Sequence, residues 1–102
     1  MMKRSLIAPE AHLFVCTNRR DADSPLGAGC GDRGEALYSA LKREVSQRGL
    51  VRALWVARSQ CLGLCPRVGC AVASTPGPAY WIEATSEDAQ TIAADALARA
   101  RV

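Results

Sequence analysis

The chain has 102 residues, of which 49% are hydrophobic and 23% are charged. This length and composition predict a single domain over residues 1–102, with enough apolar side chains for one modest core. The net charge of +3 is small, and no basic stripe is interleaved with aromatic residues, which argues against a nucleic-acid partner. No run approaches the roughly 18 apolar residues of a membrane-spanning helix, so we expect no membrane role.

The N-terminal segment resembles a signal peptide only faintly. Lys3 and Arg4 precede a short apolar stretch, but Pro9 and Glu10 interrupt it early. The five cysteines are an odd number, whereas disulfide frameworks of secreted proteins usually contain an even number. We therefore expect a cytoplasmic protein whose cysteines bind metal rather than form disulfides.

The first predicted elements are a strand and a loop. Residues 12–16 are largely apolar and predict a short buried strand that ends at Cys16. Residues 17–31 are polar and contain Pro25 and several glycines, so no regular structure is expected there.

Residues 32–49 have the periodicity of an amphipathic helix. An apolar stripe recurs every four residues, at Leu37, Leu41 and Val45. Asp32 and Glu35 have the spacing of a capping box, and this spacing predicts that the helix begins at Asp32. Gly49 is well placed to end the helix.

The second half of the chain predicts three more strands. Residues 51–58 are apolar on both faces, which is typical of a strand that is covered on both sides. Residues 70–74 and 79–83 are the next two strands, and the turn residues 75–78 between them predict a hairpin.

A last helix is predicted after Thr85 or Ser86, either of which could cap it. Glu87 and Asp88 would lie in its first turn, where acidic side chains complement the helix dipole. Its inner face is formed by Ala89, Ile92, Ala93, Ala96, Leu97 and Ala100. The order strand, helix, strand, strand, strand, helix predicts an α/β domain, with a mixed sheet of about four strands and two main helices.

Four of the five cysteines fall into two loops. Cys16 and Cys30 are spaced C-x13-C, and Cys61 and Cys65 are spaced C-x3-C. Each pair follows the carboxyl end of a predicted strand, so both loops are expected to converge at one end of the sheet. A [2Fe–2S] cluster takes four thiolates, and glycines let backbone N–H donors approach its sulfurs. The nearby glycines are Gly27, Gly29, Gly31, Gly63 and Gly69.

Other interpretations of the cysteines remain open. Cys70 begins an apolar strand and is expected to be a structural or spare thiol, although it could replace Cys65 as a ligand. Structural zinc sites usually use short cysteine knuckles on both sides, and only Cys61 and Cys65 have that spacing. A thiol–disulfide enzyme would need a C-x-x-C motif, which is missing. The single histidine, His12, is expected to fill the core or surface, and no acid–base or hydrolytic arrangement is evident.

The chain resembles the thioredoxin-like [2Fe–2S] ferredoxins of bacteria, the Shethna-type iron–sulfur proteins. The matching stretches are HLFVCTNRR at 12–20, GCGDRG at 29–34, the helix at 35–49 and RSQCLGLC at 58–65. The resemblance covers nearly the whole chain and implies a thioredoxin-like fold, a [2Fe–2S] cluster and a homodimer. It implies the cluster ligands Cys16, Cys30, Cys61 and Cys65. The chain departs from the family pattern at Val68-Gly69-Cys70, which adds a thiol close to the site.

The expected function is a one-electron carrier rather than an enzyme. A reductase would reduce the cluster, and the protein would then dock transiently on an acceptor protein. The alternative is a non-redox metal-binding or sensor protein that holds zinc or a regulatory cluster on the same cysteines. Arginines near the cysteines could offset the charge of the cluster, or they could be ordinary solvated side chains. They are Arg19, Arg20, Arg33, Arg58 and Arg67.

Overall fold

The computed structural model describes residues 1–21, 23–25, 27–64 and 66–101. The strands are β1 (Ala11–Cys16), β2 (Leu54–Ser59), β3 (Cys70–Thr75) and β4 (Ala79–Ala84). The helices are α1 (Gly31–Gln47), the short 3-10 helix η1 (Ser86–Asp88) and α2 (Ala89–Ala100). The predicted order of elements is confirmed.

The four strands form one mixed sheet in the order β2-β1-β3-β4. Strands β1 and β2 run parallel, with Cys16 opposite Ser59. Strand β3 is antiparallel to β1, and β3 and β4 form the predicted antiparallel hairpin. Because β1 and β2 are parallel, the loops that follow them leave the same end of the sheet, as the sequence predicted.

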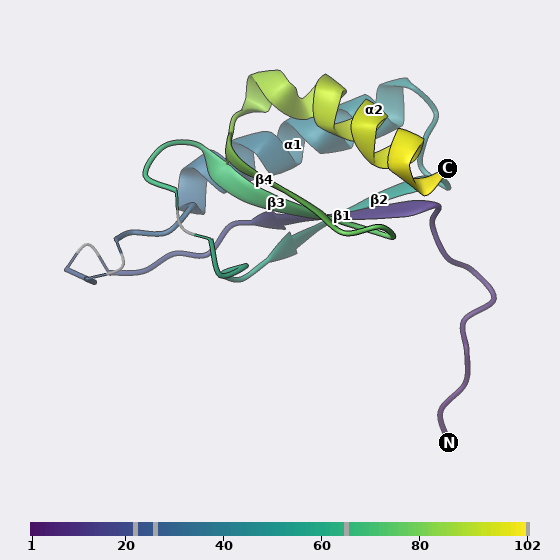
Figure 1. Ribbon diagram of the computed structural model, residues 1–102, viewed down its shortest axis with the longest axis horizontal. Coiled ribbons are helices and arrows are strands. Elements are labelled where there is room, and N and C mark those ends of the chain that lie inside the picture. Colours follow the sequence, from purple (N-terminus) through teal and green to yellow (C-terminus); the bar gives the residue numbers. More distant parts are fainter. Residues whose placement is uncertain (22, 26, 65, 102) are drawn as a thin grey trace.

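Both helices cover the same face of the sheet (Figure 1). The predicted stripe of α1 and the predicted inner face of α2 are buried there, apart from Ala100, which is half-buried. The sheet contributes Leu13, Val15, Leu54 and Val72 to this core, each at most 1% exposed. Strand residues alternate between the two faces, so their neighbours point to the opposite face, which neither helix covers.

The second strand differs from the prediction. Residues 51–53 form a turn, and β2 begins only at Leu54. Leu54 and Val56 are buried beneath α1, whereas Trp55 is 37% exposed. The expectation of cover on both sides was wrong, because β2 is an edge strand and the helices cover only one of its faces.

The predicted capping box of the first helix is also absent. The helix begins at Gly31, with Cys30 in the N-cap position and no side-chain cap. The Asp32 carboxylate pairs instead with the Arg19 guanidinium. Glu35 accepts a hydrogen bond from Arg58 Nε at 2.9 Å. Both acidic side chains therefore fasten the helix to the neighbouring chain rather than capping its first turn.

The end of α1 follows the prediction, whereas the start of the last helix differs from it. Gly49 has φ of 67°, and the Leu50 N–H donates to the Val45 carbonyl at 2.8 Å, closing the end of α1. Thr85 caps the short helix η1 rather than α2, and its backbone N–H donates to Asp88 Oδ2 at 2.9 Å in a capping box. Glu87 and Asp88 therefore lie in η1, ahead of α2, which begins at Ala89.

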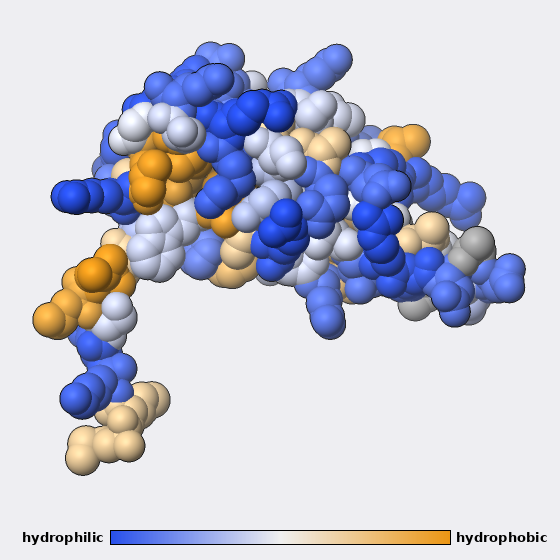
Figure 2. Space-filling model, turned by 180° about the vertical axis from the view of Figure 1, so that it is seen from behind, coloured by the Kyte–Doolittle hydropathy of each residue, from blue (hydrophilic) through white to orange (hydrophobic). Residues whose placement is uncertain are grey.

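The surface is mostly hydrophilic when the molecule is seen from behind (Figure 2). In that view, apolar side chains gather at the end of the molecule where the N-terminal arm leaves it. The arm itself exposes Met1, Met2 and Leu6 almost completely. None of the helices in the described ranges is long and apolar enough to cross a membrane.

Candidate metal centre

The first two predicted ligands meet inside the protein. Cys16 is the last residue of β1, and Cys30 is the N-cap of α1. Both are only 2% exposed, and the Cys16 side chain, after burial, contributes to raising the pKa of the Cys30 thiol. The fold thus brings together two sulfurs that the long C-x13-C spacing separates in the sequence.

Glycines make this approach possible. A Cβ atom at Gly34 would lie 1.9 Å from the Cys16 carbonyl oxygen, so only glycine lets α1 pack this closely against the end of β1. Gly29 has φ of 82°, and a Cβ there would lie 2.2 Å from the Asn18 carbonyl oxygen. The same oxygen accepts a hydrogen bond from the Gly31 N–H at 3.0 Å. The loop before α1 is therefore held against the segment that follows Cys16.

A third buried thiol lies near this pair, close enough for their charges to act on it. Cys70, at the start of β3, is completely buried. The backbone of the next residue, Ala71, lies near enough to the Cys30 side chain to favour its thiolate, although less strongly than burial disfavours it. Burial raises the pKa of the Cys30 thiol, and burial together with the negative charges that Cys30 and Cys16 would carry raises the pKa of Cys70 to about 12. A metal that binds these sulfurs must therefore displace protons.

Cys61 has different surroundings. It is exposed and lies two residues after β2, in a loop whose start is joined to β1 by a hydrogen bond from the Thr17 N–H to the Ser59 carbonyl at 3.0 Å. Its sulfur accepts a hydrogen bond from Arg20 Nη2 at 3.1 Å and another from the Gly63 N–H at 3.3 Å. Cys61 therefore lies at the same end of the sheet as Cys16, but on the solvent side.

Cys65, the fourth predicted ligand, lies outside the described residues. Among the residues that are described, no three histidine, cysteine or acidic side chains are close enough together to hold a metal ion. The structure thus buries Cys16, Cys30 and Cys70 near one another, without forming a three-cysteine metal site, and places Cys61 in the exposed loop. The glycines predicted to have unusual backbone geometry all have positive φ: Gly27, Gly29, Gly31, Gly63 and Gly69.

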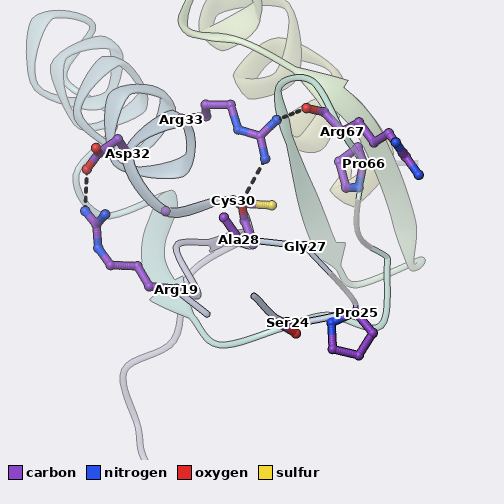
Figure 3. Close-up of a pocket in the computed structure, with 12 residues that line it drawn as sticks. Arg19, Ser24, Pro25, Gly27, Ala28, Cys30, Asp32, Arg33, Pro66 and Arg67 are labelled. Carbon is purple, nitrogen blue, oxygen red and sulfur yellow. Dashed lines mark hydrogen bonds and ion pairs between the residues drawn. The ribbon is translucent and has the colours of Figure 1, made fainter. Parts of the chain in front are cut away.

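A cavity of about 910 Å³ opens beside Cys30 and is lined by residues of both cysteine loops. In Figure 3, the Arg33 side chain extends from α1 past Cys30 toward Arg67. Its Nη2 donates to the Gly29 carbonyl at 2.8 Å, and its Nη1 donates to the Arg67 carbonyl. Sequence reasoning missed this bridge, because nothing in the chain distinguishes Arg33 from the other arginines near a cysteine.

The role of Gly34 was also missed. A glycine in the first turn of a helix lowers intrinsic helix stability by roughly 1 kcal/mol relative to alanine. A glycine at position 34 of a predicted helix therefore indicated that a close packing contact, rather than helix propensity, requires this residue. The requirement is the close contact with Cys16.

The arginines near the cysteines fall into different groups. Arg19 pairs with Asp32, and Arg58 pairs with Glu35 while its guanidinium carbon lies 4.0 Å from the centroid of the Tyr38 ring. Arg20, by contrast, contacts the Cys61 sulfur directly.

The arrangement of the sheet and helices defines a thioredoxin-like fold, which confirms the predicted fold class. The structure is similar to that of the wild-type thioredoxin-like [2Fe–2S] ferredoxin from Aquifex aeolicus. The TM-score is 0.76 at 21% sequence identity, over 89% of this chain and 88% of that one. Another structure of a thioredoxin-like [2Fe–2S] ferredoxin from Aquifex aeolicus has a TM-score of 0.72 at 23% identity, over 83% and 77% of the two chains. No protein-family model matches the chain, and no curated protein matches it.

Proposed function

We propose that the chain is a one-electron carrier that holds a [2Fe–2S] cluster on four cysteines. The proposed ligands are Cys16, Cys30, Cys61 and Cys65. The main support is that Cys16 and Cys30 share a buried site at the end of the sheet where the loop of Cys61 begins. The ferredoxins that share the fold are named for the same kind of cluster.

The donor set suits this cofactor chemically. A bound [2Fe–2S] cluster supplies a centre that takes up and releases one electron. The Gly63 N–H donates to the Cys61 sulfur, and the Ala71 backbone favours the thiolate of Cys30. Such donors stabilise thiolate charge and tune the metal centre. Because Cys30 is buried and Cys61 exposed, the interior side excludes water, while a partner protein can approach from the Cys61 side.

Cluster binding would be coupled to loss of protons from the interior thiols, and the described residues do not form a complete site by themselves. In this proposal, Cys16 and Cys30 would hold the cluster from the interior, and Cys61 and Cys65 would hold it from the loop that follows β2.

The partners proposed for this carrier are a reductase and an acceptor protein. Their contacts would be small and transient, as in other electron-transfer encounters. Arg20 lies on the Cys61 side and would contribute positive charge to the docking surface. The carrier would work in the cytoplasm as one domain over residues 1–102, without a substrate of its own.

We also propose that two copies pair through the sheet face that the helices leave open. Tyr80 and Ile82, on the edge strand β4, are 59% and 57% exposed. On the same face, the His12 ring stacks on Phe14 with ring centroids 4.3 Å apart. Pairing would remove this apolar area from water, which is favourable.

Metal analysis and cysteine-to-serine variants test the ligand assignment. Anaerobically purified protein should contain about two irons and about two acid-labile sulfides per chain. Its dithionite-reduced form should give the EPR signal of a reduced [2Fe–2S] cluster. Serine at any of the four ligand positions should lower the cluster content or shift the signal. The four variants are Cys16→Ser, Cys30→Ser, Cys61→Ser and Cys65→Ser.

The Cys70→Ser variant is the matched control, and it should keep the cluster and its spectrum. If Cys70→Ser loses the cluster while Cys65→Ser retains it, Cys70 is the fourth ligand instead. A colourless protein that contains zinc and no sulfide would contradict the electron-carrier proposal. That result would favour the non-redox metal-binding alternative.

A further inference from the structure

One arginine side chain joins the segment before Cys30 to the segment after Cys65 through two backbone carbonyls. Arg33 lies in the first turn of α1, and its guanidinium donates to the carbonyl of Gly29 at 2.8 Å and to that of Arg67. Gly29 immediately precedes Cys30, and Arg67 is the second residue after Cys65. Figure 3 shows the side chain between the two loops.

The chemistry of this bridge suits arginine. The guanidinium is a rigid planar fork with several N–H donors, so it can reach two carbonyl groups at once. A lysine ammonium carries the same charge on a flexible stem and lacks the fork. Both acceptors are backbone carbonyls in irregular segments, which have no strand or helix partner to fix their position.

The neighbouring arginines make other contacts. Arg20 also reaches the second loop, but through the Cys61 sulfur rather than through backbone carbonyls. Arg19 lies in the loop that leads into α1, and it pairs with Asp32 in the first turn of that helix. Arg58 pairs with Glu35. Both contacts join α1 to residues on the β1 and β2 side, whereas the Arg33 contact reaches the segment that leads into β3. The positive charge of Arg33 also acts on the Cys30 and Cys70 sulfurs.

We propose that Arg33 is a positioning residue for the cysteine centre, and that it clamps the loop of Cys61 and Cys65 against the Cys30 loop. The role of Arg33 in cluster binding rests on the proposed function. The contact between the two loops does not depend on that function, because it is formed by Arg33 and two backbone carbonyls. The clamp acts through two backbone carbonyls. It would hold the second loop where its sulfurs can share a centre with the buried pair.

The first test measures how fast iron leaves the loaded protein to a chelator. Arg33→Gln removes the charge and most of the fork, and it should release iron about 10- to 100-fold faster, as is usual when a residue supporting metal ligands is lost. Arg33→Lys should also release iron faster, because it keeps the charge but not the fork. The matched control is Arg43→Gln, an exposed position on the same helix, and it should behave as wild type. An Arg33→Lys protein as slow as wild type would show that charge suffices and would overturn the clamp.

The second test is hydrogen exchange on the purified chain, whatever its iron content. Arg33→Gln should increase exchange in residues 27–30 and 66–69 and leave β1 and α2 unchanged. Unchanged exchange in the two loops, or an increase spread over the whole chain, would overturn the clamp. Because this measurement needs no iron, a wild-type protein without iron would contradict the proposed function and still leave the clamp tested.

Discussion

The behaviour of each cysteine is set by its immediate surroundings. Cys70 is completely buried in the hydrophobic core, and burial holds its pKa far above that of an ordinary thiol. Such a thiol is inert toward electrophiles, since the thiolate is the reactive form. Cys61 instead faces solvent, with Arg20 and Gly63 donating to its sulfur. Cys70 is thus suited to a structural role in the core, and Cys61 is suited to bind metal at the surface.

His12 provides a prediction about pH. Partial burial lowers the pKa of His12 from 6.5, because desolvation disfavours the imidazolium. The unfolded state then binds more protons than the folded state, so this contribution to stability is present above pH 6.5 and is lost as the pH falls through the lowered pKa. We expect urea denaturation to show a decreasing free energy of unfolding below pH 6.5.

The control is His12→Phe, which keeps an aromatic ring beside Phe14 and cannot titrate. The comparison is confined to pH values above about 5, where most carboxylates remain ionised. The stability difference between variant and wild type should change across this window. A difference that stays constant would show that His12 does not contribute to the pH dependence.

Helix α1 organises the site as an element. Its N-cap is Cys30, its first turn carries the Arg33 bridge, and Glu35 in the next turn pairs with Arg58 at the end of β2. Gly34, next to Arg33, lets this end of α1 pack directly against the Cys16 backbone. A single helix end therefore fixes the position of the loops that follow both parallel strands.

Gly34→Ala tests this contact between elements. The new Cβ would meet the Cys16 carbonyl at 1.9 Å, so α1 or β1 must shift. We expect the free energy of unfolding to fall by about 1–3 kcal/mol, the usual cost of overpacking. The control is Ser39→Ala, an exposed position on the same helix, which should change stability little. If Gly34→Ala stabilised the protein, as alanine does in an unconstrained helix, the contact would not be restrictive.

The whole molecule is asymmetric about its sheet. Both helices lie on one face of the sheet (Figure 1). The opposite face carries exposed aromatic and aliphatic side chains, which no layer among the described residues covers. Exposed contiguous apolar surface of this kind often marks an interaction site. The cysteine loops leave the end of the sheet rather than this face, so pairing there would leave the loops accessible.

Sedimentation of the purified protein tests the proposed pairing. Wild type should sediment as a dimer, and Ile82→Glu should yield monomers, because pairing would bury an unpaired carboxylate. The control is Val51→Glu, at a similarly exposed position on the turn before β2, which should remain dimeric. A monomeric wild type, or an Ile82→Glu dimer, would contradict pairing through this face.

Much of this architecture follows from the sequence alone. The period of Leu37, Leu41 and Val45 determines the buried face of α1, because helical repeats place these positions on one side. The hairpin of β3 and β4 follows from the turn residues between two apolar runs. The convergence of the two cysteine loops also follows, once the strands before them are taken as parallel.

Only the tertiary structure decides which contacts form between distant segments. Asp32 had the local spacing of a capping residue, yet its carboxylate pairs with Arg19 instead. Trp55 lies on the face of the sheet that neither helix covers, and no local pattern specifies which face the helices will cover. The Arg33 bridge and the Gly34 contact likewise join residues that are far apart in the sequence and meet only in the folded chain. Local patterns encode which face of an element is buried, whereas the neighbour it meets depends on how all the elements pack together.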